Sequence, residues 1–336
     1  MNNEIIEKIN QSLNPNITDI ENDKPYFSDK RYKAHKIEKT NFHEIKETET
    51  NKKIAFIDGG NAEILKTANF SLQLVRVYAT IYQNNKRIDS KREEFFVLTS
   101  TITENQKIKY KTTIFNNDLI NDQLTFDLYD KTLQEGGHKV NISKIGEVAR
   151  RFAELKLIEK LTDQLNNAII VRDGSLQSSV THESKYFESL YKKALEKNTI
   201  IAGLCKTTTL ITEKGNSLTY TLTKLAPVGT WYYHPVVDIE HPDHQAELFF
   251  TKLHKNSNHT FRFEFYKRQK PEINELLSLL ARNSKDPIFF GYPYGLIEAD
   301  RFARITNNEK EYWKTIIASK LKFNTKESHE ILDSIS

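Results

Sequence analysis

The sequence lacks the features of secreted and membrane-anchored proteins. It has one cysteine in 336 residues, Cys205, which excludes an internal disulfide framework and favours a reducing compartment. No apolar run approaches the ~20 residues that a membrane-spanning helix needs. The first residues also lack the basic and apolar segments of a signal peptide. We therefore expect a cytoplasmic protein that does not bind a membrane.

The sequence also has few glycines and a small net charge. Only 11 glycines occur, which is few for a fold built on several glycine-rich phosphate loops. A net charge of +4 permits nucleic-acid binding but does not argue for it. The chain is 38% hydrophobic and 28% charged, as in globular proteins, and has no internal repeat or low-complexity linker. These properties favour one large domain.

Two similar motifs carry the most chemical information. A short apolar run at residues 54–57 leads to Asp58 and a double glycine, and a second run leads to Asp173 and Gly174. We predict that each run is a buried strand and that the glycines turn the chain sharply. An Asp-Gly turn after a strand is common and needs no functional explanation. If the two strands are neighbours, however, their carboxylates could bind one hard cation.

A helix between these motifs carries further acidic residues. We predict a helix that Ser143 caps and that runs to about Leu165. Glu154 belongs to a helical row of apolar residues, and Glu159 holds a similar place, so spacing does not choose between them. Either could simply reach solvent from the margin of the buried face.

The remaining pattern predicts an α/β fold with a mixed sheet flanked by helices. Residues 1–50 form a polar arm with a short amphipathic helix, 51–325 form the single large domain, and 326–336 form a tail. A strand, helix and strand up to Leu204 predict a parallel pair joined by a right-handed crossover. Further strands are expected at 69–81, 94–102, 220–233 and 261–266, and further helices at 272–282, after 291 and at 309–322, with Pro271 as the first residue of the helix at 272–282.

Two other stretches suggest ligands only weakly. Residues 203–209 contain Lys206 and Thr207, but the glycines of an ATP-binding phosphate loop are missing. Lys206 could still contact a phosphate as a point charge. The histidine-rich and acidic stretch at 234–244 contains prolines and no recognised ligand spacing, so we interpret it as a polar loop.

Four motifs in order resemble the NurA nuclease family over about residues 50–305. They are Phe56-Ile57-Asp58-Gly59-Gly60, Val171-Arg172-Asp173-Gly174-Ser175-Leu176, Gly203-Leu204-Cys205-Lys206-Thr207, and the stretch from Gly291 through Tyr292-Pro293-Tyr294-Gly295 to Asp300. The resemblance implies an RNase H-like fold and a DNA nuclease that depends on Mn²⁺ or Mg²⁺. It also implies a homodimer and a hexameric HerA-type translocase as partner, acting in DNA end resection during double-strand break repair.

The resemblance also assigns roles to single residues. Asp58 and Asp173 match the two metal-binding aspartates of the family. The third metal ligand is a helix glutamate, for which Glu154 fits best by its distance from Asp173, with Glu147 or Glu159 as alternatives.

Two of the motifs depart from the family pattern. The family's tyrosine and histidine near the C-terminus fall in the stretch from Tyr292 to Asp300 of the fourth motif, where Asp300 stands at the histidine position. In the first motif, Gly60 stands where family members usually carry serine. These departures leave the metal preference and the general base open.

The residue types suit phosphodiester hydrolysis. Two divalent ions roughly 3.5–4 Å apart can supply the nucleophile and stabilise the leaving oxygen, and carboxylates are the ligands that Mn²⁺ and Mg²⁺ prefer. The candidate catalytic residues are Asp58, Glu154, Asp173, Asp300, Lys206 and Tyr292. Lys206 would pair with a phosphate or a carboxylate, and Tyr292 could stack on an unpaired base or simply pack in its turn.

Two alternatives differ in function. A non-catalytic protein on the same scaffold would bind DNA or the translocase without cleaving, and the residues at positions 60 and 300 are compatible with that. A kinase of the actin-like fold is the second alternative, but it needs more glycine-rich loops than this chain offers.

Overall fold

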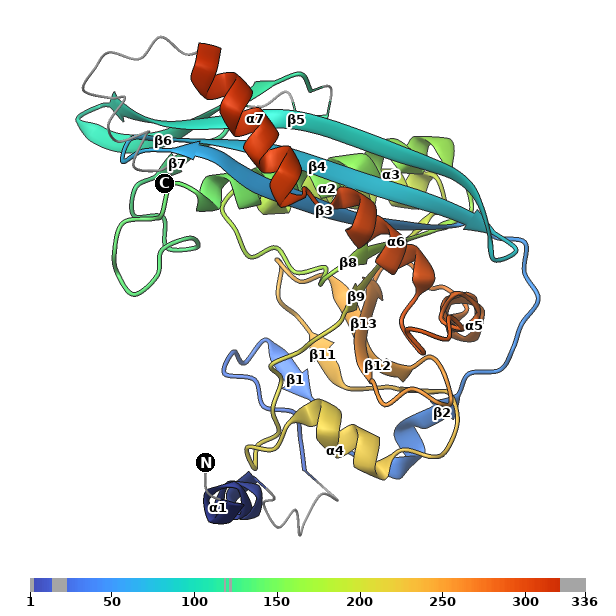
Figure 1. Ribbon diagram of the computed structural model, residues 1–336. Coiled ribbons are helices and arrows are strands. Elements are labelled where there is room, and N and C mark those ends of the chain that lie inside the picture. Colours follow the sequence, from blue (N-terminus) through green and yellow to red (C-terminus); the bar gives the residue numbers. More distant parts are fainter. Residues whose placement is uncertain (1–2, 14–22, 118, 121–122, 321–336) are drawn as a thin grey trace.

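The computed structural model describes residues 3–13, 23–117, 119–120 and 123–320. Eleven strands form one mixed sheet in the order β2-β10-β12-β13-β9-β8-β3-β4-β5-β6-β7, and β1 pairs with β11 beside it (Figure 1). The strands are β1 (Tyr32–Ala34), β2 (Phe42–Glu44), β3 (Ile54–Lys66), β4 (Phe70–Gln83), β5 (Lys86–Glu104), β6 (Lys107–Phe115), β7 (Thr125–Asp127), β8 (Ile169–Asp173), β9 (Ile200–Cys205), β10 (Trp231–Tyr233), β11 (Val237–Ile239), β12 (Ala246–Lys252) and β13 (Phe261–Tyr266).

Helices cover both faces of this sheet (Figure 1). They are α1 (Asn3–Leu13), α2 (Lys144–Gln164), α3 (Glu183–Glu196), α4 (Leu218–Leu225), α5 (Ile273–Asn283), α6 (Tyr294–Ala303) and α7 (Asn307–Lys320), with a short 3₁₀ turn at Lys39–Asn41. Side chains of α2 and α3 pack with Ala55 and Ile57 on one face. Side chains of α5 and α6 pack with Ile54 and Phe56 on the other, because successive strand residues point to opposite faces.

The parallel centre of the sheet confirms the prediction from the two aspartate motifs. β3 pairs with β8 in parallel, and β8 pairs with β9 in parallel across α3. The remaining pairs of the large sheet are antiparallel, from the β3–β6 strands on one side to the β13–β10 strands on the other. The predicted mixed sheet flanked by helices is therefore present.

The predicted turn after Asp58 is wrong. β3 continues through Gly59 and Gly60 to Lys66, because β4 pairs with it in one register from Ile54 to Glu63 and, after a shift of register, at Leu65 and Lys66. The two glycines serve close packing instead. A Cβ on Gly59 would lie 2.6 Å from Oε1 of Glu154, and a Cβ on Gly60 would lie 2.3 Å from the carbonyl oxygen of Ala303. Both distances are too short for a side chain, so the helices on each face approach the strand at these positions.

Other boundaries also differ from expectation. The stretch at 220–233, predicted as strand, contains helix α4, which buries Leu218 and Leu222 one turn apart, and becomes strand only at Trp231. Ser143 precedes α2 but its side chain does not cap it. Helix α5 begins at Ile273, with the preceding Glu272 as its cap, so Pro271 is not its first residue.

The polar arm at residues 1–50 is partly built into the sheet. β1 and β2 both come from it and pair with β11 and β10. The tail predicted at 326–336 and the end of the helix predicted at 309–322 lie outside the described residues. Among the residues that are described, no helix combines the length and the apolar character needed to cross a membrane.

Candidate active site

Asp58 and Asp173 lie on neighbouring parallel strands, which is the condition that the metal-site hypothesis requires. The pairing of β3 with β8 ends at Ile57 and Arg172, so the aspartates are the next residues on two adjacent parallel strands. β8 ends there, and the chain turns at Gly174 with a φ of +119°, whereas β3 continues. The site therefore occupies the point where one strand stops and its neighbour runs on.

Asp58 is buried among other carboxylates, and the charge of Arg150 offsets this only in part. Burial, and after it the charges of Glu154 and Asp173, raises the pKa of Asp58 to about 7. Its Oδ1 accepts a hydrogen bond of 2.7 Å from the backbone N–H of Gly59. Among the described residues no cationic side chain forms an ion pair with Asp58. A cation placed here would relieve this repulsion.

Asp173, in contrast, has two partners from the other predicted motifs. Nζ of Lys206 lies 2.9 Å from its Oδ2, and the hydroxyl of Tyr292 donates to the same oxygen over 3.1 Å. Burial alone would lower the pKa of Lys206, but the hydrogen bond and charge of Asp173 raise it. Burial and Asp173 also raise the pKa of Tyr292. Lys206 and Tyr292 therefore stay protonated and hold this carboxylate in place.

The expectation that Tyr292 could stack on a base is not met. The residue is 8% exposed. The ammonium group of Lys206 lies 4.9 Å from the centre of its ring, and the ring of Phe261 packs at 5.4 Å. Tyr292 thus packs in its turn, and its hydroxyl is the part that reaches the site.

Glu154 is held by two arginines from α2 and β8. It is 2% exposed. Arg150, one turn earlier in the helix, pairs with its Oε1, and Nη2 of Arg172 donates to its Oε2 over 2.9 Å. Arg150 also donates to the carbonyl of Gly59 over 3.1 Å, which joins the helix to β3. Both oxygens of this carboxylate are therefore occupied by guanidinium groups.

The two alternative glutamates of α2 lie elsewhere. Glu159 bonds to Lys156 and to the hydroxyl of Ser189, on the side facing α3. Glu147 is exposed. Glu154 is thus the glutamate whose charge acts on Asp58.

The fourth motif supplies the rim of the site. Gly295 lets α6 approach β3 closely, because a Cβ there would lie 2.0 Å from the ring of Phe56. Asp300 on this helix is half-exposed and pairs with Arg304 at 3.2 Å. Its charge contributes to the raised pKa values of Lys206 and Tyr292, so it lies near them without bonding to them.

The arrangement does not form a ready metal cluster. Within the described part of the chain, no three acidic, histidine or cysteine side chains converge closely enough to hold an ion. The same holds for the histidine-rich stretch at 234–244, where His244 bonds to buried Glu264 at 3.2 Å. The interpretation of that stretch as a polar loop is wrong in its middle part, because Val237–Ile239 forms the strand β11, which pairs with β1.

The two arginines that bind Glu154 were not predicted from the sequence. Arg150 precedes Glu154 by four residues, a spacing at which opposite charges meet on a helix. Arg172 stands in an apolar strand, where a charge has to find a partner. Each spacing suggests that the arginine has a partner, but neither identifies Glu154 as that partner unless the arrangement of the strands is known.

The fold and the site together define a mixed α/β protein with an acidic cluster at the junction of two parallel strands. The family model for the NurA domain matches residues 52–305, and the chain belongs to the NurA family. This assignment leaves no support for an actin-like kinase. A search of curated proteins found no significant match.

Solved structures that are similar to this chain extend the comparison. The crystal structure of the NurA nuclease from Sulfolobus solfataricus is similar with a TM-score of 0.55 and 16% identity, over 96% of this chain and 98% of that one. The catalytic domain of human endonuclease V is similar at a TM-score of 0.40 and 11% identity, over 83% of this chain and 92% of that one. At such identities the likeness to the first structure establishes the fold.

Proposed function

We propose that this protein is a DNA nuclease that hydrolyses phosphodiester bonds with the help of Mn²⁺ or Mg²⁺ on an RNase H-like scaffold. The observation that carries the proposal is the pair of aspartates on adjacent parallel strands. Lys206 pairs with Asp173, whereas Asp58 forms no ion pair with a cationic side chain among the described residues. Membership of the NurA family and the similarity to a NurA nuclease support the same conclusion.

Asp58 and Asp173 are the residues that would hold the metal. The raised pKa of Asp58 reflects buried negative charge, which suits a divalent cation. Mg²⁺ is often bound by only one or two carboxylates together with water and substrate phosphate, so two aspartates suffice for one ion. Glu154 would join them only after exchanging its arginines for the ion. A bound ion of this type supplies an activated water and stabilises charge on the leaving oxygen.

Lys206 and Tyr292 position the substrate in this proposal. Lys206 is 44% exposed at its side chain and already lies beside Asp173. Its ammonium group can move from that carboxylate to a substrate phosphate, because lysine binds phosphate as a point charge and needs no fixed orientation. Tyr292 keeps its proton and orients Asp173. Asp300, at the rim, would bind or repel groups entering the site according to their charge.

We propose three partners: DNA, a second copy of this chain and a HerA-type hexameric translocase. With them the protein would act in the cytoplasm, in the resection of DNA ends during double-strand break repair. An exposed apolar cluster before and on α6 supports docking of a protein partner. Ile288 is 79% exposed, and Phe289, Tyr294 and Phe302 are about half exposed beside a cavity of about 700 Å³. Apolar clusters of this kind mark protein contact surfaces.

The test is cleavage of labelled linear single- and double-stranded DNA with Mn²⁺, Mg²⁺ or EDTA. We expect cleavage by the wild type with metal only, and none by Asp58→Asn or Asp173→Asn. Asp89→Asn, on an exposed position of β5, is the matched control and should cleave normally. If the wild type is inactive alone and with a translocase partner, the nuclease proposal is wrong.

One observation favours the alternative of a non-catalytic DNA- or translocase-binding protein. Glu154 is bound by two arginines, and no third acidic ligand converges with the aspartates among the described residues. That protein would bind Mn²⁺ and DNA but cleave nothing. Calorimetric titration with Mn²⁺ beside the cleavage assay separates the two functions.

A further inference from the structure

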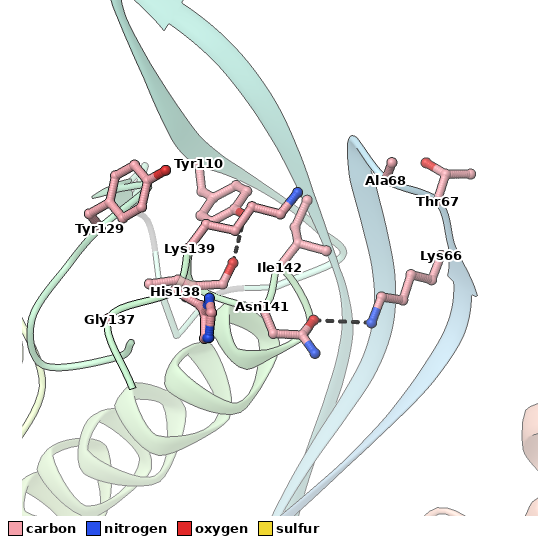
Figure 2. A pocket seen from close by; sticks show the side chains of 11 residues that line it. Lys66, Thr67, Ala68, Tyr110, Tyr129, Gly137, His138, Lys139, Asn141 and Ile142 are labelled. Carbon is pink, nitrogen blue, oxygen red and sulfur yellow. Dashed lines mark hydrogen bonds between the residues drawn. The ribbon is translucent and has the colours of Figure 1, made fainter. Parts of the chain in front are cut away.

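A basic pocket lies at the C-terminal end of β3 (Figure 2). It has a volume of about 630 Å³ and forms where the end of β3, the turn into β4, Tyr110 of β6 and the segment before α2 meet. Its walls are residues 66–68, Tyr110, Tyr129 and 137–142. The proposed nuclease site uses none of these residues.

The charged side chains that line this pocket are both positive. They are Lys66 and Lys139, with His138 beside them, and no acidic residue of the described chain is in the wall. Nζ of Lys66 donates only to the neutral side chain of Asn141, at 3.0 Å (Figure 2). Among the described residues, the side chains of His138 and Lys139 form no ion pair or hydrogen bond. Cations gathered in a hollow without counter-charges attract an anion.

Two acidic residues near the pocket in the described part of the chain, Glu135 and Glu63, do not neutralise it. Glu135 pairs with Lys144 at the start of α2. Glu63 of β3 accepts hydrogen bonds from the hydroxyls of Ser143 and Ser71. Both carboxylates therefore have partners of their own outside the pocket wall.

An exposed aromatic ring borders these cations. Tyr129 is 58% exposed, and in Figure 2 its ring lies at the edge of the pocket beside Tyr110. Tyr110 itself is buried and donates to the carbonyl of Val140 over 2.7 Å, which fixes the floor. Cations that contact phosphates, next to a ring on which a base can stack, are the usual combination in proteins that bind single strands.

The distance from the candidate active site suits a substrate strand. Helix α2 connects the two places, with the pocket before its first turn and Glu154 near its middle. Glu154 lies ten positions after Lys144, the first residue of α2, which at 1.5 Å per residue is about 15 Å. At the 3.4 Å spacing of nucleotides along one strand this corresponds to about four nucleotides.

We propose that this pocket is a second contact site for a single-stranded part of the nucleic-acid substrate. Lys66 and Lys139 bind its phosphates, His138 adds a hydrogen-bond donor, and Tyr129 stacks on one base. The nature of the ligand rests on the proposed nuclease function, and the pocket adds a place where the strand is held several nucleotides from the point of cleavage.

The test measures binding without cleavage. The fluorescence anisotropy of a labelled oligothymidylate of about twenty nucleotides is followed in EDTA at several salt concentrations. The double variant Lys66→Ala/Lys139→Ala should bind more weakly than the wild type. The slope of log Kd against log salt should fall by about 1.4, since each phosphate contact on a single strand contributes about 0.7. Tyr129→Ala should weaken binding at least about fivefold.

A matched double variant controls for the general loss of positive charge. Lys192 on α3 and Lys270 before α5 are both exposed and lie outside the pocket wall. Lys192→Ala/Lys270→Ala should keep the wild-type salt slope. Lys139→Glu, a single change of an exposed side chain, provides a variant that cannot disturb the core, and thermal melting verifies the fold of each protein.

The outcomes separate this proposal from the nuclease proposal. An unchanged affinity and slope in the pocket variants, an equal loss in the control, or no binding by the wild type overturns the pocket proposal. Binding that is lost only in the pocket variants supports it even if no DNA is ever cleaved, in which case the nuclease proposal alone fails.

Discussion

Replacing Asp58 by asparagine should stabilise the metal-free protein above neutral pH. Burial and the neighbouring carboxylates of Glu154 and Asp173 raise the pKa of Asp58 from 3.8 to about 7. Between these values the folded protein keeps a proton that the unfolded chain has lost. The free energy of unfolding of the wild type therefore falls as the pH rises from about 4 to about 7, and stays low above that window.

The size of the effect follows from the two pKa values. The interval from 3.8 to about 7 corresponds to about 4 kcal/mol at alkaline pH, and an amide avoids this cost because it carries no charge. Near pH 5 only the first part of the window has been crossed, so the gain should shrink to about 1.5 kcal/mol. Below about pH 3.5 the variant and the wild type should be equally stable in this respect.

Urea denaturation in EDTA measures this difference. Trp231 and Trp313 pack in two separate clusters, so their fluorescence follows the unfolding of different parts of the sheet. Asp89→Asn serves as the control for removing an exposed acid. The reasoning is refuted if Asp58→Asn is no more stable than the wild type near pH 8, or if the gain is the same at both pH values. Added Mn²⁺ should reverse the order, because it stabilises the form that binds it.

Three further substitutions test individual contacts of the site. Glu154→Gln should lower the free energy of unfolding by about 3–5 kcal/mol, because two guanidinium groups lose their carboxylate; a neutral result in urea denaturation would contradict the role of this clamp. Gly60→Ser should lower it by about 1–3 kcal/mol, since the new Cβ would meet the carbonyl oxygen of Ala303 at 2.3 Å, and the melting temperature reports this. Tyr292→Phe removes the hydrogen bond to Asp173 but keeps the ring, so it should cost about 1 kcal/mol of stability and lower kcat more than KM.

The centre of the fold was predictable because its signals are local. An apolar run that ends in Asp-Gly identifies a strand, and the spacing between Asp173 and Leu204 leaves room for one helix between two parallel strands. Those two features predict the strands and the parallel β8–β9 pair, whereas the pairing of β3 with β8, which brings Asp58 and Asp173 together, became known only from the structure.

The parts that sequence reasoning missed depend on partners distant in the chain. Asp58 and its glycines favour a turn locally, but pairing with β4 on both sides of these residues keeps the chain extended. The β-branched and aromatic residues after Leu218 suggest a strand, whereas burial of one helical face decides for α4. Tyr292 was a candidate for stacking on a base, but Lys206 lies over its ring in the structure. In each case a tertiary contact overrides the local preference.

The three carboxylates of the candidate site differ in what neutralises them, and this difference assigns them different roles. Glu154 is bound on both oxygens by arginines, so it joins α2 to β8 and shapes the field that Asp58 experiences. Asp173 is balanced by Lys206, a partner that is exposed enough to exchange. Of the three, Asp58 alone has no ion pair with a cationic side chain among the described residues. A cation that binds Asp58 and Asp173 would take over the charge that Lys206 now balances, and that lysine would then be available to a substrate phosphate. The unfavourable burial of Asp58 is therefore the feature that would couple metal binding to substrate binding.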